Sequence, residues 1–416
     1  MNPATKQWLR LLRPEGALDL VKRRIAKVRR QLKKVDRFVG HFEPPDGVEV
    51  KGDVLVAYIA DAFMLKEGPG RVDESRIPHS HTHWWESLQI VETFLDLGYR
   101  VDATSWLNTE FRPTKSYKAA LDVRILLQDW APQLPADCVK ILHAETAHCS
   151  WHNPAQQGRL EALEARRGRG VGAVKLIEDN KSLEVADAVT LIGEDAPWVH
   201  DSYAWAGAPI YPIPISTPLL FDPIPRDYAK ARRRFLWFGS AGLVHKGLDL
   251  VLEAFAGMPE LELTICGPIN REREFEREYW RELYETPNIR VHGWIDIATP
   301  DFQSLMARHA SVIFQSCSES QNGGIITTMH AGAVPILSRE TGVPLTPERG
   351  VLLDDCEIDT LRSTLRDVAG RSPEALQALS DAARRYAREH HTRDRFARVY
   401  KASIERILKA GVRPPS

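Results

Sequence analysis

The sequence predicts an α/β protein built from two doubly wound parallel-sheet domains that face each other across a cleft. Short apolar strand candidates alternate with helical segments from Val54 almost to the C-terminus, and such an alternation is typical of parallel sheets covered by helices on both faces. A chain of 416 residues is too long for one ordinary hydrophobic core. A proline-rich stretch near the middle separates two halves of similar pattern.

Each half of the chain contains its own series of strand candidates. In the first half they are residues 54–60, 100–106, 123–127, 139–143, 188–192 and 210–215, and in the second half residues 235–238, 261–266, 289–293, 311–314, 334–337 and 351–353. The proline-rich stretch 209–218, with Pro223 and Pro225 after it, is typical of an extended linker. We therefore expect an N-terminal domain at 41–215, a linker at 216–232 and a C-terminal domain at 233–390. Residues 373–408 predict two helices broken near His391, and we expect the segment 391–416 to pack back on the N-terminal domain.

Composition restricts the class of protein. A hydrophobic fraction of 43% with 8% aromatic residues is that of a globular chain in water. The formal charge of −1 argues against nucleic-acid binding, which needs a strong basic excess. The five cysteines form no CxxC pair, the N-terminus has no apolar signal core, and no apolar run reaches the roughly 18 residues of a membrane span. These features predict a cytoplasmic protein.

Residues 1–40 differ from the rest of the chain. Apolar residues recur at alternating spacings of three and four from Leu18 to Val39, and lysines and arginines fill the gaps between them. This pattern predicts a basic amphipathic helix. Two interpretations stay open: attachment to an anionic surface on the inner face of the plasma membrane, where each basic residue contributes roughly 1 kcal/mol, and a solvated helix that lies on its own domain.

The segment from Phe314 to Leu337 predicts a ligand-binding crevice. An apolar strand leads into a polar loop with one carboxylate, Glu319, and then into the pair Gly323-Gly324, a short helix and a second apolar strand. Glycines at a strand-to-helix turn let backbone N–H groups approach an anion, and the positive end of the helix favours phosphate.

The segment 235–247 repeats this arrangement. Its apolar strand is followed by a loop with Gly239 and Gly242, and Lys246 comes just before the next helix. Ligands of doubly wound sheets gather at the carboxyl ends of the strands. Two anion-binding loops in one half of the chain therefore predict a site for a diphosphate.

These motifs resemble those of a known family. The loop that ends in Lys-Gly-Leu-Asp-Leu, the pattern Ser316-x-x-Glu319 and the following Met-x-Ala-Gly-x-Val-Pro are similar to the GT-B glycosyltransferases of family 4, which retain anomeric configuration. The resemblance covers roughly residues 50–400 and is strongest from 235 to 340. It implies two Rossmann-like domains, with a nucleotide diphosphate sugar held mainly by the C-terminal domain and the acceptor mainly by the N-terminal domain. It also implies that no metal or other cofactor is needed, because a basic pair neutralises the leaving diphosphate.

The first loop departs from the family pattern. Ser240 stands where the family usually has an arginine, and the loop is one residue longer, so Lys246 lacks its usual basic partner. Charge neutralisation then falls to backbone N–H groups from Gly239 to Gly242, to Arg339, or to a group that the sequence does not identify.

The second loop departs as well. The family motif has two glutamates eight positions apart; Glu319 fits the first, but Thr327 stands at the second, which usually binds the ribose hydroxyls. Thr327 or Thr328 can make one such hydrogen bond but not a charged bidentate pair.

The resemblance assigns roles to individual residues of this chain. We expect Lys246 to bind phosphate rather than to be a solvated loop lysine, and Glu319 to bind donor-sugar hydroxyls, a role compatible with capping the helix that follows. The predicted catalytic residues are His143, Lys246 and Glu319. The predicted donor-binding residues are Gly239, Ser240, Gly242, Lys246, Gly267, Glu319, Asn322, Gly323, Gly324 and Thr327.

His143 ends the strand candidate 139–143. The family often has a histidine at this strand tip, over the reaction centre, and we carry that role to His143. His148 and His152 are interpreted as ordinary loop histidines, and Glu145 as a lesser catalytic candidate.

Three alternating histidines, His79, His81 and His83, precede two tryptophans. Three imidazoles can bind zinc or copper, but no cysteine or nearby carboxylate pair completes a ligand set, so no metal site is predicted. Family members hold the acceptor in this region, and the predicted acceptor-binding residues are His83, Trp84 and Trp85, with a tryptophan stacked on a sugar. The alternative is that both tryptophans begin a buried helix that runs to residue 97.

The predicted function is a retaining glycosyltransferase that moves a sugar from a nucleotide diphosphate sugar to a glycan or lipid-linked acceptor, in bacterial surface polysaccharide synthesis. Two alternatives stay open. The first is a catalytically silent GT-B module that binds a glycan or a partner, which the changes at Ser240 and Thr327 favour. The second is a GT-B sugar-nucleotide epimerase. A nicotinamide dehydrogenase is disfavoured because no GxGxxG follows an early strand.

Overall fold

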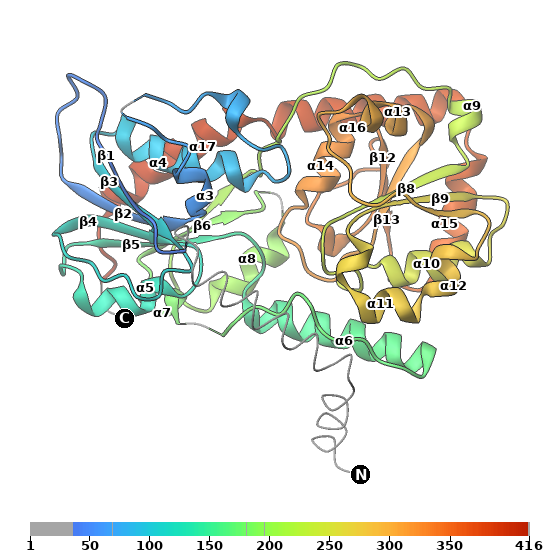
Figure 1. Cartoon of the computed structure of the whole chain (residues 1–416), viewed down its shortest axis with the longest axis horizontal. Helices are drawn as coiled ribbons and strands as arrows, with labels where there is room; N and C mark the ends of the chain where they lie inside the picture. The colour runs from blue at the N-terminus through green and yellow to red at the C-terminus, as the bar shows by residue number, and fades with distance from the viewer. Residues whose placement is uncertain (1–35, 69, 180, 195, 415–416) are drawn as a thin grey trace, which may run out of the picture.

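The computed structural model describes residues 36–68, 70–179, 181–194 and 196–414. Two α/β halves lie side by side, each a mostly or wholly parallel sheet with helices on its faces (Figure 1). This is the predicted fold class, two doubly wound domains.

The N-terminal half is built on a seven-stranded sheet of order β1-β3-β2-β4-β5-β6-β7. Its strands are β1 (Val39–Phe42), β2 (Asp53–Tyr58), β3 (Arg100–Ser105), β4 (Tyr117–Asp122), β5 (Val139–Ala144), β6 (Ala188–Ile192) and β7 (Ile210–Ile213), and its helices are α3 (Ala60–Phe63), α4 (His83–Asp96), α5 (Leu126–Trp130), α6 (Cys149–Arg167), α7 (Ser182–Val185) and α8 (Pro197–Ala204). The edge strand β1 is antiparallel to β3, and the other pairings are parallel. The strand order reverses between β2 and β4, which is the switch point of this sheet.

The C-terminal half is built on a six-stranded parallel sheet of order β10-β9-β8-β11-β12-β13. Its strands are β8 (Arg234–Phe238), β9 (Glu262–Cys266), β10 (Ile289–Val291), β11 (Ser311–Phe314), β12 (Val334–Ser338) and β13 (Val351–Leu353), and its helices are α9 (Tyr228–Ala231), α10 (Leu248–Ala256), α11 (Arg273–Glu278), α12 (Trp280–Tyr284), α13 (Pro300–Arg308), α14 (Gly323–His330), α15 (Ile358–Gly370) and α16 (Pro373–His390). The switch point lies between β8 and β11. Every strand predicted in this half is present, with ends displaced by at most two residues.

Two expectations for the N-terminal half are wrong. Residues 123–127 are not a strand, because β4 ends at Asp122 and α5 begins at Leu126. The Asp122 carboxylate accepts hydrogen bonds from the backbone N–H groups of Leu126 (2.7 Å) and Leu127 (3.1 Å), which turns the chain into the helix. A short apolar run fits a buried helix as well as a strand. The basic helix expected at 1–40 lies outside the described residues up to position 35, and its predicted end is wrong because Val39 begins β1.

The C-terminal segment forms two helices. α16 ends at His390, and the last helix, α17 (Arg393–Ala410), begins after Thr392, whose hydroxyl accepts from the backbone N–H of Arg395 at 3.1 Å. α17 returns to the N-terminal half and packs on α4 and β7 (Figure 1). Together with the chain that crosses at residues 214–227, it joins the halves twice.

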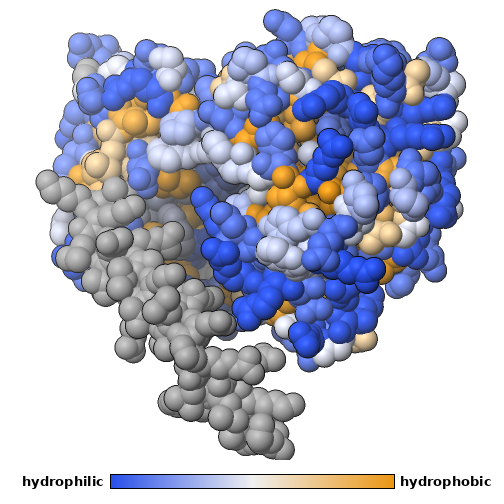
Figure 2. Space-filling model, turned by 45° about the vertical axis from the view of Figure 1, so that its right-hand side comes forward, coloured by the Kyte–Doolittle hydropathy of each residue, from blue (hydrophilic) through white to orange (hydrophobic). Residues whose placement is uncertain are grey.

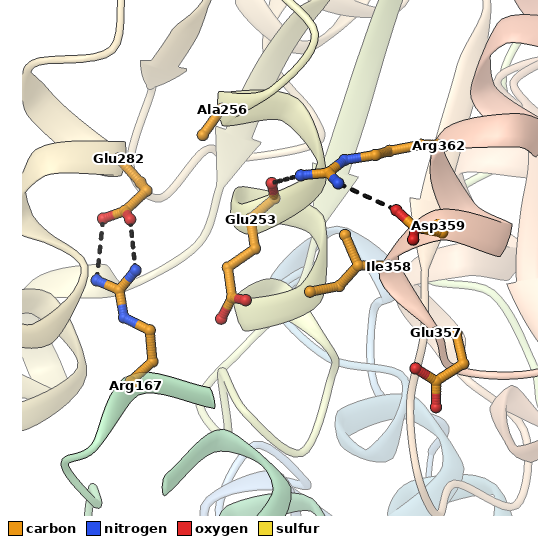
Figure 3. A pocket seen from close by; sticks show the side chains of 8 residues that line it. All are labelled: Arg167, Glu253, Ala256, Glu282, Glu357, Ile358, Asp359 and Arg362. Atoms are coloured by element: carbon orange, nitrogen blue, oxygen red, sulfur yellow. Dashed lines mark hydrogen bonds and ion pairs between the residues drawn. The ribbon is translucent and has the colours of Figure 1, made fainter. Parts of the chain in front are cut away.

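The long helix α6 connects the halves by side-chain contacts. It leaves the N-terminal half and runs beneath the C-terminal half (Figure 1), where Arg166 pairs with Asp249 at 2.7 Å. Figure 3 shows the side chains that line a pocket at this junction. Its volume is about 660 Å³. Its two arginines are already paired, Arg167 with Glu282 and Arg362 with Asp359, so we place no ligand there.

Candidate functional site at the junction of the two halves

The switch points of the two sheets face each other at the junction of the halves. The loop after β11 contacts the loop after β5, because the Ser320 hydroxyl donates to the backbone carbonyl of Glu145 at 2.5 Å. The surface is hollowed between the halves (Figure 2). Since ligands of doubly wound sheets bind at switch points, we call this junction the cleft and describe its two sides in turn.

The C-terminal side of the cleft is centred on an ion pair between Lys246 and Glu319. The Lys246 side chain is buried, and its ammonium lies over the Phe314 ring, 5.4 Å from the centroid. The Nε2 atom of His245 lies 3.4 Å from the same carboxylate oxygen. Burial acts to raise the pKa of Glu319, but the charge of Lys246 and the hydrogen bond from His245 hold this pKa well below its ordinary value. The structure therefore brings the two principal residues of the sequence prediction together, with Glu319 ionised.

Several backbone N–H groups of the first loop are already bonded within the protein. The N–H of Gly239 donates to the carbonyl of Cys266 at 3.0 Å. The N–H of Gly242 donates to the Glu272 carboxylate, and the N–H of Leu243 donates to the same carboxylate at 3.1 Å. The N–H groups of Gly239 and Gly242 are therefore not free to bind a diphosphate, which removes two of the four N–H groups that the sequence analysis expected there.

Two further residues of the prediction lie on or behind the first loop, and one lies elsewhere. Ser240 is exposed on the loop, and Gly267 lies behind it, where a Cβ atom would come within 2.7 Å of the Gly239 carbonyl oxygen. Arg339 is exposed and lines a crevice of about 740 Å³ between α6 and the C-terminal half, together with Trp151.

The second loop leads into α14. Asn322 is the N-cap of this helix, since its side-chain oxygen accepts from the backbone N–H of Ile325 at 3.0 Å. Gly323 and Gly324 form the first turn and are partly exposed. Such first-turn N–H groups have no acceptor within a helix. Thr327 is buried, and its hydroxyl donates to the Gly323 carbonyl at 2.8 Å, so this proton is used inside the helix.

The N-terminal side of the cleft is built around Glu145. Its carboxylate accepts from the hydroxyl of Tyr58 and lies 3.1 Å from His83 Nδ1 and 3.8 Å from Arg124 Nη2. Burial, followed by the charge of Glu145, raises the pKa of Tyr58, so the phenol stays protonated. Burial lowers the pKa of His83 to about 3, so this imidazole is neutral. The Tyr58 hydroxyl therefore holds this carboxylate in place, with a neutral imidazole and a guanidinium beside it.

His143 lies in the core beneath this carboxylate. Its side chain is fully buried, and its Nδ1 atom lies 2.9 Å from Thr190 Oγ1. The rings of Tyr58 and Tyr400 meet it edge-on at 5.6 and 5.7 Å, and burial lowers its pKa to about 4. His143 therefore lies beneath the cleft and not over the reaction centre, where the sequence analysis expected it. Glu145, which directly follows β5, is the side chain that reaches the cleft.

The three predicted acceptor residues separate in the structure. His83 contacts Glu145 in the cleft. Trp84 packs, partly buried, against the core. Trp85 is buried in α4, donates its indole N–H to Glu74 at 3.1 Å and meets Phe396 of α17 edge-on. Both tryptophans thus begin a buried helix, as in the alternative interpretation, and Trp85 has no face free for a sugar.

Three residues that the sequence analysis did not single out also belong to the cleft: Tyr58, Arg124 and Lys175. Tyr58 ends β2 and Arg124 follows β4, so their places beside a switch point were a usable signal. Lys175 lies in the loop after α6, where no strand or glycine pattern marks it.

Three further features of the described part of the chain bear on its function. Within it, no group of three or more His, Cys, Asp or Glu side chains is arranged to hold a metal ion. None of the helices found there is long and apolar enough to cross a membrane. Cys138, Cys266, Cys317 and Cys356 are free thiols.

Comparisons with known proteins agree with this architecture. Residues 232–369 match the family model described as glycosyl transferases group 1, and no curated protein sequence matches the chain. Among solved structures, the chain resembles sucrose-phosphate synthase from Thermosynechococcus elongatus with 13% identity and a TM-score of 0.60, over 86% of this chain and 100% of that one. It also resembles Anabaena HepE in complex with UDP and glucose, with 12% identity and a TM-score of 0.49 over 86% and 99% of the two chains.

At this level of identity, the likeness to sucrose-phosphate synthase shows the fold. The two facing parallel-sheet domains have the GT-B architecture of glycosyltransferases. The family match adds that the C-terminal half, which carries Lys246 and Glu319, has the sequence pattern of group 1 glycosyltransferases.

Proposed function

We propose that this chain, whose residues 232–369 match the group 1 glycosyltransferases, is itself a retaining glycosyltransferase that uses a nucleotide diphosphate sugar as donor. A shared fold does not define an activity, so the proposal depends on the site. The observation that carries it is the Lys246–Glu319 pair at the C-terminal switch point, inside the matched segment and across the cleft from Glu145.

Both members of the ion pair can exchange their mutual contact for contacts with the donor. The diphosphate takes Lys246 as its counter-ion and approaches the first-turn N–H groups of α14, where the helix dipole favours negative charge. Glu319, released from Lys246, accepts hydrogen bonds from the hydroxyls of the donor sugar. The charged hydrogen bond from Lys246 stabilises the departing diphosphate more strongly than a neutral hydrogen bond would.

The N-terminal side holds the acceptor. Glu145 is an oriented carboxylate, which stabilises the positive charge that develops on the sugar as the diphosphate leaves. His83, whose Nδ1 atom faces Glu145, is the acceptor contact that we retain from the sequence prediction. In a front-face reaction, the acceptor oxygen bonds to the anomeric carbon, the bond to the diphosphate breaks, and the acceptor proton passes to the leaving phosphate. The protein then supplies orientation and charge stabilisation. The acceptor that we propose is a glycan or lipid-linked sugar of a bacterial surface polysaccharide.

Two variants test the donor site by calorimetric titration. A thermal-shift screen against UDP, GDP, ADP, CMP and dTDP sugars first identifies the donor. Lys246→Ala should then weaken both the free nucleotide and the nucleotide sugar by about tenfold to a hundredfold, because a charged hydrogen bond contributes roughly 1.5 to 3 kcal/mol. Glu319→Gln should spare the free nucleotide and weaken the sugar donor. Lys230→Ala, at a lysine whose side chain is 81% exposed, is the matched control. If neither cleft variant changes the binding of any donor, the assignment is wrong.

A catalytically silent GT-B module is the second candidate. Ser240 leaves the first loop without its arginine, and Thr327 uses its hydroxyl proton within α14, so nucleotide contacts common in the family are lost. Hydrolysis of the donor by the purified wild-type protein would exclude this candidate, whereas donor binding without hydrolysis or transfer would favour it. A GT-B epimerase would consume the nucleotide sugar without any acceptor.

We also propose that residues 1–40 attach the protein to an anionic membrane surface, on the basis of their basic amphipathic pattern. A chain that lacks residues 1–35, which leaves β1 (Val39–Phe42) intact, should keep its activity on a water-soluble acceptor and lose binding to anionic liposomes. Failure of the full-length protein to bind such liposomes at low salt, where the attraction is strongest, would refute this.

A further inference from the structure

The first loop lacks a second cation for a diphosphate. Ser240 supplies no charge, and the N–H groups of Gly239 and Gly242 bond to other parts of the protein. Arg339 lines the crevice beside α6. Lys246 alone cannot balance a diphosphate, and it also has Glu319 as a partner.

Lys175 lies against this loop although it belongs to the N-terminal half. A Cβ atom at Gly242 would come within 2.5 Å of Lys175 Cγ and 3.3 Å of its Cε, so the lysine stem runs along the face of this glycine. Gly242 also has a φ of 91°, a backbone conformation that side chains rarely adopt. The glycine thus leaves room for a lysine from the opposite half, whose ammonium is one bond beyond Cε.

Hydrogen bonds on both sides of Lys175 hold its loop in place. On one side, the N–H of Gly172 donates to Glu274 of α11 at 2.7 Å, which ties the loop to the C-terminal half. On the other side, Ile177 exchanges two hydrogen bonds with the Asn153 side chain, at 2.8 and 2.9 Å. The loop is therefore anchored to α6 and to the C-terminal half at once.

The environment of Lys175 is that of an unpaired cation. His152 lies with Nε2 2.7 Å from the Lys175 carbonyl, and its ring is tilted against that of His245, the residue before Lys246, with ring centroids 4.8 Å apart. Burial, and then the charge of Lys246, lowers the pKa of Lys175. In the described part of the chain, no carboxylate forms an ion pair with the Lys175 ammonium, whereas Lys246 is paired with Glu319.

We propose that Lys175 supplies the second cation of the diphosphate site and, with Lys246, binds the donor diphosphate between the two halves. The inference rests on the proposed function for the identity of the anion. It makes the donor site composite: the site is complete only when the N-terminal half lies against the first loop. A bound diphosphate offsets the repulsion between the two lysines, so donor binding stabilises the contact between the halves.

Calorimetric titration of the full-length protein tests this, with inorganic pyrophosphate and with the nucleoside diphosphate that the wild type binds. Lys175→Ala should weaken both ligands by about tenfold or more, as expected for a charged hydrogen bond. Lys175→Arg keeps the charge and should restore most of the affinity. Lys181→Ala removes an exposed lysine from the same loop and should leave both affinities unchanged. Circular dichroism and thermal unfolding of each variant show whether it is folded.

The outcomes separate this inference from the proposed function. If Lys175→Ala is folded and binds both ligands as the wild type does, the inference is wrong and the donor site on Lys246 stands. If pyrophosphate binding depends on Lys175 but the protein neither hydrolyses nor transfers any nucleotide sugar, the inference holds and the glycosyltransferase assignment falls. If the wild type binds neither pyrophosphate nor a nucleoside diphosphate, both are wrong.

Discussion

The two sides of the cleft are assembled in different ways. The C-terminal side comes from two short segments, 239–247 and 315–324, each directly after a strand. The N-terminal side comes from five separate places in the chain, represented by Tyr58, His83, Arg124, Glu145 and Lys175. A motif can be recognised where neighbours in sequence bind the same ligand. A site whose residues come from separate parts of the chain has no such motif in the sequence.

His143→Ala probes the N-terminal side most strongly. His143 fills core space between Tyr58 and Tyr400, so its removal should lower the free energy of unfolding by about 2 to 5 kcal/mol, as for other large-to-small core substitutions. Urea unfolding measures this, and turnover per folded molecule should change little. His292→Ala, at an exposed histidine whose partner Asp301 is itself 60% exposed, is the control. If His143→Ala has normal stability but its turnover is reduced more than tenfold, His143 acts at the reaction centre and the structural role is wrong.

This contrast also explains which parts of the structure the sequence could predict. In the C-terminal half, apolar strands alternate with helices, the strands lie where expected, and Lys246 and Glu319 lie in the loops that follow two of them. In the N-terminal half, β4 was not predicted, because it contains Lys118 and two alanines and is not a continuous apolar run. The apolar run that follows it was predicted as a strand but leads into the helix α5. The roles of Glu145 and Lys175 depend on contacts with residues far away in the chain. Local pattern carries no information about such contacts.

Glu86 bonds to the segment that crosses between the two halves, and its protonation should make the stability of the protein depend on pH. This buried carboxylate accepts from the N–H (2.9 Å) and the hydroxyl (2.7 Å) of Ser216 in the crossing segment, and burial raises its pKa to about 7 from the ordinary 4.5. The folded protein therefore holds a proton that the unfolded chain releases between these values. Stability should fall as the pH rises from 5 to 8, by at most about 3 kcal/mol, since one pKa unit corresponds to about 1.4 kcal/mol.

The corresponding measurement is urea unfolding at pH 5 and pH 8 for the wild type, Glu86→Gln and the exposed control Glu389→Gln. Glu86→Gln should lose this part of the pH dependence, whereas Glu389→Gln should keep it. Identical pH dependence in the wild type and Glu86→Gln would show that Glu86 is not the group that titrates.

Glu145→Gln asks whether the N-terminal side acts in the reaction or only in binding. Glutamine keeps the shape but loses the charge, so we expect turnover to fall by about tenfold or more, equivalent to about 1.4 kcal/mol, while the affinity for free nucleoside diphosphate stays unchanged. Steady-state kinetics and calorimetry measure the two quantities. Glu161→Gln on the exposed face of α6 is the control. Unchanged turnover would confine the chemistry to the C-terminal side.

Asn322 tests whether the donor phosphates lie at the N-terminus of α14, because it caps this helix beside the proposed phosphate position. Asn322→Ala removes the hydrogen bond to Ile325 and should cost about 1 kcal/mol of stability, the usual value for a lost N-cap. Asn322→Asp keeps the cap, since aspartate caps helices as well as asparagine does, but adds a negative charge. If the donor phosphates lie at this helix N-terminus, Asn322→Asp should bind nucleoside diphosphate several-fold more weakly than the wild type while its unfolding midpoint in urea is unchanged. Equal affinity in Asn322→Asp would place the phosphates away from α14, and the cleft would then depend on Lys246 and Lys175 for its anion.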